Sequence, residues 1–157
     1  MVAVITRVKS ASVKVDGYYS AQIEKGLLVL LGVADDDTDA DAEYLANKII
    51  GLRVFEDENG KMNLSLDDVG GSIAVVPNFT LNADCKRGRR PDFNGAAKPE
   101  KAKMLYEKFL QYCCPKERDV QTGVFGGYMA VESHNDGPVT IVMDSKTMMK
   151  SRKREES

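Results

Sequence analysis

The sequence predicts a single α/β domain of the α+β type, with a strand-rich sheet and two helices. Three observations lead to this class. The length of 157 residues fits one domain and leaves little room for a second. Apolar runs rich in Val and Ile are frequent, whereas only two segments repeat their apolar residues with the helical period. Strands also precede each helix in groups rather than singly, which argues against a doubly wound sheet.

The first third of the chain is predicted to be mostly strand. Residues 2–8 are rich in Val and Ile, and residues 12–15 alternate polar and apolar. Asp16-Gly17 is a hairpin turn signal, and a second strand follows at residues 19–23. Residues 26–33 are a continuous apolar run between glycines, which is typical of a strand buried on both faces.

An acidic segment, residues 35–41, leads into the first predicted helix. Thr38 and Asp41 have the spacing of a capping box, and Leu45, Ile49 and Leu52 then fall on one helical face. A calcium-binding loop is the alternative. It fails because neither register of the acidic residues places Gly at the sixth position or Glu at the twelfth.

Short strands are predicted at residues 53–55, 64–66 and 72–76. Pro77 cannot donate a hydrogen bond to a sheet, so we expect the strand to be interrupted or to lie at an edge there. In an edge strand, Phe79 and Leu81 would face the core. Residues 82–98 form a long irregular stretch. The second helix is predicted to start at Pro99, to run to about Cys113 and to be ended by Pro115.

Two strands are predicted near the end of the chain, at residues 128–133 and 139–143, with a turn at residues 134–138. The domain is therefore expected to cover residues 1–145. The charged residues 146–157 are expected to form a frayed, flexible tail.

Composition excludes several classes of catalyst. The chain has one His and three Cys, and no two Cys are spaced as C-x-x-C. Zinc sites with two or more His ligands are therefore impossible within one chain, and we expect no metal and no disulfide framework. Packing explains Cys113 better than a Cys–His nucleophile with His134 does. The cysteine pattern and the lack of a long apolar run indicate a cytoplasmic protein without a membrane span.

Two short segments together point to a known family. One reads Phe79-Thr80-Leu81, and the other reads Asn135-Asp136-Gly137-Pro138-Val139-Thr140. The chain resembles the D-aminoacyl-tRNA deacylases, in which S-Q-F-T-L and N-x-G-P-[VF]-T segments form the active site. The resemblance extends through residues 3–17, 26–33, 53–63, 87–93 and 122–126, and so covers the chain to about Ser145.

The resemblance implies a function and an assembly. It implies a compact, barrel-like homodimer that hydrolyses the ester between a D-amino acid and the terminal ribose of tRNA, without a cofactor. Glycyl esters, including glycine mischarged on tRNA(Ala), are a further implied substrate. The implied partners are therefore aminoacyl-tRNA and a second copy of the chain, with the active site at the subunit interface.

The resemblance also assigns residues. The main chain at Phe79 and Thr80 is implied to polarise the ester carbonyl, and Thr80 is expected to position the substrate because no base lies beside it. A cis Gly137-Pro138 pair, braced by Arg7, is implied to exclude L-amino acids from the partner's pocket. The residues implied to bind substrate are Pro77, Asn78, Leu81, Ala102, Phe125, Met129 and Asn135, with Ala102, Phe125 and Met129 near the terminal adenosine.

Two features keep the interpretation open. Pro77-Asn78 replaces the family's Ser-Gln, which leaves a non-catalytic or weakly active tRNA-binding homologue as the alternative. Net charge is −2, but Lys86, Arg87, Arg89 and Arg90 follow the Phe79-Thr80-Leu81 segment. This basic loop (residues 86–90) fits contact with RNA phosphates, whereas the cations of residues 150–154 fit a solvated tail better.

Overall fold

The computed structural model describes residues 1–114 and 118–155, and within these ranges it contains eight strands, three α-helices and one 3₁₀ helix. No helix in the described ranges is long and apolar enough to cross a membrane. The elements in chain order are β1 Val2–Val15, β2 Tyr18–Ile23, β3 Gly26–Gly32, α1 Asp39–Ile50, β4 Phe55–Glu56, β5 Met62–Leu64, β6 Ser72–Pro77, η1 Phe79–Asn82, α2 Pro99–Cys113, β7 Val120–Thr122, β8 Met129–Asp144 and α3 Ser145–Glu155.

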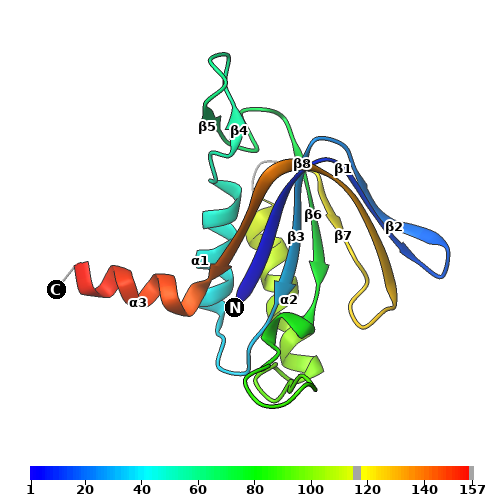
Figure 1. The fold of residues 1–157 in the computed structure, drawn as a ribbon, viewed down its shortest axis with the longest axis vertical. Coiled ribbons are helices and arrows are strands. Elements are labelled where there is room, and N and C mark those ends of the chain that lie inside the picture. Colours follow the sequence, from blue (N-terminus) through cyan, green and yellow to red (C-terminus); the bar gives the residue numbers. More distant parts are fainter. Residues whose placement is uncertain (115–117, 156–157) are drawn as a thin grey trace.

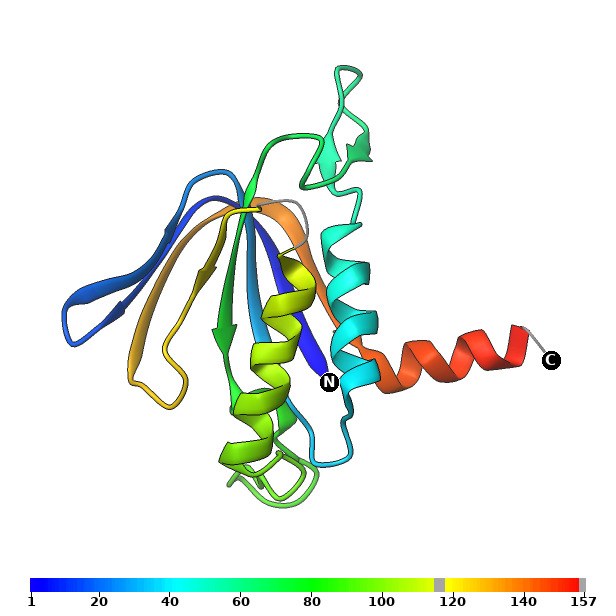
Figure 2. The same cartoon turned by 180° about the vertical axis from the view of Figure 1, so that it is seen from behind.

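Six strands form one strongly curved, nearly closed sheet (Figure 1). The order is β2-β1-β3-β6-β7, and β8 pairs with β1. The long strand β1 is antiparallel to β2, β3 and β8, whereas β3, β6 and β7 run parallel. Parallel neighbours need crossover connections, and these contain α1 between β3 and β6 and α2 between β6 and β7. Both helices cover the same face of the sheet (Figure 2).

The central strand β3 is buried on both faces, as the apolar run predicts. Leu27, Val29 and Leu31 belong to the main core between the sheet and the two helices. Leu28 packs on the opposite face, in a smaller core enclosed by the curl of β1 and β2 with Val8 and Val13. The sheet therefore carries a core on each side, which accounts for the β-branched and apolar composition of its strands.

The start of α1 confirms the predicted capping box. The Asp41 carboxylate accepts hydrogen bonds from the Thr38 backbone N–H and from its hydroxyl, both at 2.9 Å. The same carboxylate accepts a hydrogen bond from Ser145 Oγ at 2.7 Å and lies 3.1 Å from Lys146 Nζ. Next to it, the Met1 α-ammonium group donates to Asp37 at 2.5 Å and to Ser145 at 2.9 Å. The acidic segment thus joins the N-terminus to the start of α3.

Three predictions about local structure are wrong. The charge pattern predicts a frayed tail, but residues 145–155 form α3, a third helix that extends away from the body (Figure 1). The edge position predicted at Pro77 is confirmed, because Val76 and Pro77 pair with β3 alone and not with β7. Pro77 is tolerated there because it is the last residue of β6, so its missing N–H falls beyond the β7 pairing, which ends at Val75. Phe79, however, is expected from the sequence to face the core and is instead 58% exposed, which is the second wrong prediction.

The third wrong prediction is the turn at residues 134–138. The structure has one continuous strand, β8, and the pairing with β1 shifts register there, between Thr6 and Val8. In that shift Thr6 pairs with Thr140 and Val8 pairs with Asn135. Residues 136–139 therefore bulge out of the ladder instead of reversing the chain. The second helix matches its prediction at Pro99–Cys113, while Pro115 lies outside the described residues.

Candidate active site

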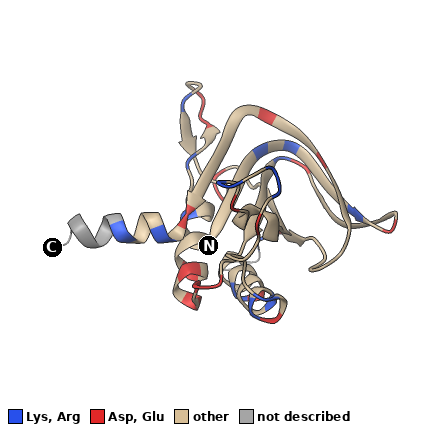
Figure 3. Ribbon diagram, turned by 60° about the horizontal axis from the view of Figure 1, so that its bottom comes forward, with Lys and Arg blue, Asp and Glu red and all other residues tan. Residues whose placement is uncertain are grey.

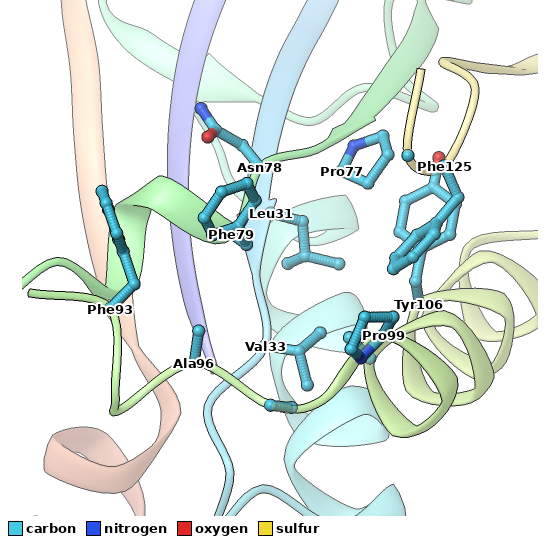
Figure 4. A pocket seen from close by; sticks show the side chains of 13 residues that line it. Leu31, Val33, Pro77, Asn78, Phe79, Phe93, Ala96, Pro99, Tyr106 and Phe125 are labelled. Carbon is cyan, nitrogen blue, oxygen red and sulfur yellow. The ribbon is translucent and has the colours of Figure 1, made fainter. Parts of the chain in front are cut away.

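A cavity of about 420 Å³ lies where β3 and β6 end and where η1 and α2 begin (Figure 4). Phe79 and Phe93 form one side, Tyr106 and Phe125 form the opposite side, and Leu31 lies between them. The rest of the lining is Val33, Pro77, Asn78, Ala96, Ala97, Pro99, Ala102 and Gly126. A cavity with aromatic and aliphatic walls and few polar groups fits a flat, largely apolar group such as a nucleobase.

The ionisable groups near this cavity are not built for proton transfer. The Tyr106 hydroxyl is buried and donates to the Val75 carbonyl at 2.8 Å. Burial, with a smaller contribution from Cys113, raises the pKa of Tyr106 far above its ordinary value. Burial likewise raises the pKa of Cys113 to about 12, so its thiol stays protonated. His134, in contrast, is exposed on β8. These positions agree with a packing role for Cys113 and leave it unsuited to act as a nucleophile.

The 3₁₀ helix η1 is held tightly against the end of β3. Asn78 N–H donates to the Leu31 carbonyl at 2.8 Å, and the Asn82 side chain donates to the Val33 carbonyl at 3.1 Å. Gly32 makes this close approach possible, because a Cβ there would lie 2.9 Å from Leu81 Cβ and from Asn82 Nδ2. The backbone of η1 is therefore fixed relative to the sheet.

Two adjacent backbone donors at the start of η1 remain unpaired. Phe79 N–H and Thr80 N–H make no hydrogen bond to any acceptor in the described part of the chain. The first N–H groups of a helix have no partner within the helix, so they are available to the oxygen atom of a bound ligand. Phe79 is exposed, at 58%, and lies at the rim of the cavity. These two donors form a candidate oxyanion site.

The Thr80 side chain is oriented but not activated. Its hydroxyl donates to the Asn78 side-chain oxygen at 2.5 Å. A carboxamide is not a base, so it cannot take the hydroxyl proton and generate a nucleophile. The same bond occupies the Asn78 amide oxygen. The Asn78 side chain is thus coupled to Thr80.

A second hollow, about 830 Å³ in volume, lies on the sheet face that the helices leave bare. It shares Pro77, Asn78 and Phe79 with the first cavity. The other residues that line it are Thr6, Leu28, Leu30, Val76, Gly126, Gly127, Tyr128, Met129, Val131, Ser133 and Asn135. Tyr128, at 97% exposure, and Val131, at 39%, leave an apolar surface beside it.

The structure brings most of the predicted site residues together, but in two groups. Ala102 and Phe125 line the first cavity, whereas Met129 and Asn135 line the second hollow. Met129 therefore does not line the same cavity as Phe125, although the resemblance implies that both lie near the terminal adenosine. Leu81 lines neither and packs under η1 against Gly32. Sequence reasoning missed Tyr106, Phe93 and Leu31. The helical period predicts that Tyr106 is buried, but nothing in the sequence places it at a cavity.

Gly137, Pro138 and Arg7 form a separate unit. The Gly137-Pro138 peptide bond is cis, as the resemblance implies. Arg7 is 5% exposed; its Nη1 donates to the Val54 carbonyl at 2.6 Å, and its Nε donates to the Asp136 carbonyl at 3.2 Å. Its Nε also lies 3.1 Å from the Asp136 carboxylate. Arg7 thus holds the base of the bulge. Gly137 and Pro138 line neither hollow, and a Cβ added at Gly137 would meet no atom of the described chain within 4 Å.

Metal-binding side chains do not cluster within residues 1–114 and 118–155. No group of three or more His, Cys, Asp or Glu side chains there could hold an ion.

Comparison with known proteins places the chain in a family. The profile of the family described as D-Tyr-tRNA(Tyr) deacylase matches residues 4–144. The D-aminoacyl-tRNA deacylases of Fervidobacterium nodosum and Desulfatibacillum aliphaticivorans are 56% and 58% identical, and each comparison covers 93% of this chain and 98% or 100% of the relative. A solved structure of a c-Myc DNA unwinding element binding protein superposes with a TM-score of 0.87 at 41% identity, covering 92% of this chain and 98% of that one. The chain therefore belongs to the D-Tyr-tRNA(Tyr) deacylase family and is a hydrolase of that class.

Proposed function

We propose that this protein hydrolyses the ester that joins a D-amino acid to the terminal ribose of tRNA, and that it also accepts glycyl-tRNA, including glycine mischarged on tRNA(Ala). It would act as a chiral proofreading enzyme in the cytoplasm, where translation uses the tRNA that it frees. The observation that carries the proposal is the pair of N–H groups at Phe79 and Thr80 that have no acceptor among the described residues and lie beside a cavity that fits a nucleobase.

The chemistry follows from these two features. The terminal adenine enters the apolar cavity between Phe125 and Phe79, which brings the ester carbonyl to η1. Water attacks the carbonyl carbon, and the resulting oxyanion accepts hydrogen bonds from the Phe79 and Thr80 N–H groups. The C–O bond to the ribose then breaks, and the ribose oxygen takes up a proton. Each oxyanion donor contributes about 3 kcal/mol, and orientation of the reactants contributes roughly 7–11 kcal/mol.

The side chains around the carbonyl supply no strong base. Thr80 is bonded to Asn78 and positions the substrate, and the 2′-hydroxyl of the same ribose assists the attacking water. A substrate that ends in 2′-deoxyadenosine is therefore expected to react much more slowly. Thr80→Ala is expected to weaken productive binding. Loss of all turnover with unchanged tRNA binding would contradict the positioning role.

Rejection of L-amino acids is assigned to a second copy of the chain. The bulge at residues 136–139 stands out of its own sheet and is braced by Arg7, so its backbone is stiff and projects outward. The exposed apolar surface around Tyr128 and Val131 offers a face for a second copy. In such a homodimer Gly137 and Pro138 enter the partner's hollow, and their backbone excludes the side chain of an L-amino acid but not that of a D-amino acid or glycine.

One experiment tests the activity itself. Purified protein is incubated with D-tyrosyl-, L-tyrosyl- and glycyl-tRNA, and loss of the ester is followed over time. We expect hydrolysis of the D and glycyl esters only. Hydrolysis of the L ester alone would refute the proposal. Absence of hydrolysis with retained tRNA binding would favour the alternative, a non-catalytic or weakly active tRNA-binding homologue.

A glycine substitution tests the shared site. Because a Cβ at Gly137 would have no atom of the described residues within 4 Å, Gly137→Ala should fold normally. In a homodimer with a shared site the added methyl enters the partner's pocket, and we expect D-tyrosyl-tRNA hydrolysis to fall about a hundredfold. Gly95→Ala is the matched control, since the nearest atom to its Cβ is the Asn82 carbonyl oxygen at 3.8 Å. Equal activity of the two variants would refute the cross-subunit role.

A further inference from the structure

The basic loop has a fixed shape. Asp84 and Asp92 pair in antiparallel fashion at its base, with N–H to carbonyl distances of 2.7 and 2.9 Å. The Asp84 carboxylate accepts a hydrogen bond from Lys86 N–H, and the Asp92 carboxylate accepts one from Asn94 N–H. Gly88 has a φ of +68°, which lets the chain reverse at the tip. The loop is therefore closed and ordered by its own backbone.

The four cations of the loop are exposed and unpaired. Lys86, Arg87, Arg89 and Arg90 make no side-chain hydrogen bond or ion pair within the described part of the chain. The acidic segment lies near the basic loop in space, because Asp35 N–H donates to the Gly95 carbonyl at 3.0 Å. The carboxylates of Asp36, Asp37, Asp39 and Asp41 bond or pair elsewhere, and those at the base of the loop cap its backbone. The positive charge is thus left for an external anion.

An aromatic pair connects the basic loop to the oxyanion site. The Phe93 ring packs edge-on against Phe79, with ring centroids 5.3 Å apart (Figure 4). Phe93 also lines a hollow over the loop together with Lys86, Arg87, Arg90, Pro91 and the two residues at its base, Asp84 and Asp92, whose carboxylates cap backbone N–H groups. Cations beside an exposed aromatic ring are the usual arrangement for single-stranded nucleic acid, since phosphates meet the cations and a base can stack on the ring. Figure 3 brings this end of the molecule forward and shows the basic segments on it.

We propose that the basic loop binds the phosphate groups of the single-stranded RNA just 5′ of the nucleotide that carries the ester. This assignment rests on the proposed function, because it takes the terminal nucleotide to lie in the cavity between Phe79 and Phe125. From there the strand can continue in only one direction, towards its 5′ side. The route over Phe93 leads to four cations that have no partner among the described residues, whereas the route over the acidic segment leads to carboxylates that repel phosphate.

The test measures binding of tRNA that carries no amino acid, so that the result does not depend on ester hydrolysis. The Kd is determined from 50 to 200 mM salt for the wild type, for the double variant Arg87→Gln/Arg90→Gln and for the control Lys61→Gln. Lys61 is exposed in the β4–β5 hairpin at the opposite end of the molecule (Figure 1). Each lost contact to a single strand lowers the slope of log K against log salt by about 0.7. Between 50 and 200 mM salt, the fold-loss of affinity should therefore be about seven times smaller for the double variant than for the wild type.

A second measurement separates this proposal from the proposed function. The ratio of kcat/KM for D-tyrosyl-tRNA to kcat/KM for the phosphate-free ester D-tyrosyl-adenosine should fall in the double variant and not in Lys61→Gln. The loop assignment would be overturned if the double variant had the same Kd and salt slope as the wild type. It would also be overturned if the wild-type protein did not bind tRNA. If no ester is hydrolysed but tRNA binding still depends on the loop, the proposed function fails and the loop assignment stands.

Discussion

The acidic segment and the basic loop are both dense runs of charge, yet the structure treats them in opposite ways. The acidic segment has five Asp in seven positions, and two of them, Asp37 and Asp41, are almost fully buried. The basic loop has four cations in five positions, and all are exposed and unpaired within the described chain. Charge density alone therefore does not say whether a run holds the fold together or meets a ligand. The partners of each charge decide this.

The largest expected effect comes from Asp41. Asp41→Ala removes the acceptor for Thr38, Ser145 and Lys146 and leaves the fully buried Ser145 hydroxyl without that acceptor. We expect the free energy of unfolding to fall by about 3 kcal/mol, as for other broken buried networks. Urea denaturation measures it, and Glu43→Ala, on the exposed side of α1, is the control. A loss below about 1 kcal/mol would show that the acidic segment is not structural.

The pH dependence of stability gives the next largest effect. Burial alone would raise the pKa of Asp41, but the hydrogen bonds from Ser145, Thr38 and Lys146 outweigh it and lower the pKa to about 2. A carboxylate with a depressed folded-state pKa stabilises the protein above its unfolded pKa of 3.8, and this contribution is lost as the pH falls towards 2. We expect a loss of about 2 kcal/mol across that window.

The control for this titration is Asp41→Asn, which carries no charge to titrate. Urea unfolding at a series of pH values should show a shallower decline for this variant than for the wild type between pH 4 and pH 2. Parallel declines would mean that other carboxylates dominate acid unfolding, and that the buried acidic segment is electrostatically no different from an exposed one.

The contrast between the two segments also shows how far a sequence can be interpreted. The capping box of Thr38 and Asp41 is local, three residues apart, and its spacing predicts it correctly. The bond from Ser145 to Asp41 joins residues 104 positions apart, and no local pattern announces it. Without this anchor at the start of α3, the charged residues that follow predict a frayed tail rather than a helix.

The same distinction between local patterns and tertiary contacts applies to the candidate site. The helices α1 and α2 follow from the helical period, and the two-faced burial of β3 follows from its continuous apolar run. The resemblance draws attention to Phe79, Thr80, Ala102 and Phe125. Tyr106 and Phe93 reach the cavity only through the packing of α2 and the closure of the basic loop, which are tertiary events. The bulge in β8 reads as a turn in the sequence, because Asn, Asp, Gly and Pro favour turns locally and the pairing with β1 overrides that preference.

A smaller effect tests how the basic loop is held. Phe93→Ala removes the ring contact with Phe79 but leaves all four cations in place. We expect about 1 kcal/mol loss of stability, a several-fold rise in Kd for tRNA and an unchanged salt slope, because position and not charge is altered. Met104→Ala, which removes an exposed apolar side chain from α2, is the control. A reduced slope would mean that the loop loses its shape without Phe93.

The smallest effect is expected at Asp36, the exposed neighbour of the buried acids. Its carboxylate is 78% exposed and lies 3.9 Å from Lys146 Nζ, so solvent screens the pair and either side chain can rehydrate. Asp36→Asn should therefore change the free energy of unfolding by less than about 0.5 kcal/mol, although it stands next to Asp37 in the chain. Urea denaturation of Asp36→Asn beside Asp41→Ala places the two results on one scale. A loss at Asp36 comparable to that at Asp41 would mean that the whole run acts as one network. In that case burial of individual carboxylates would not be the property that gives the acidic segment its structural role.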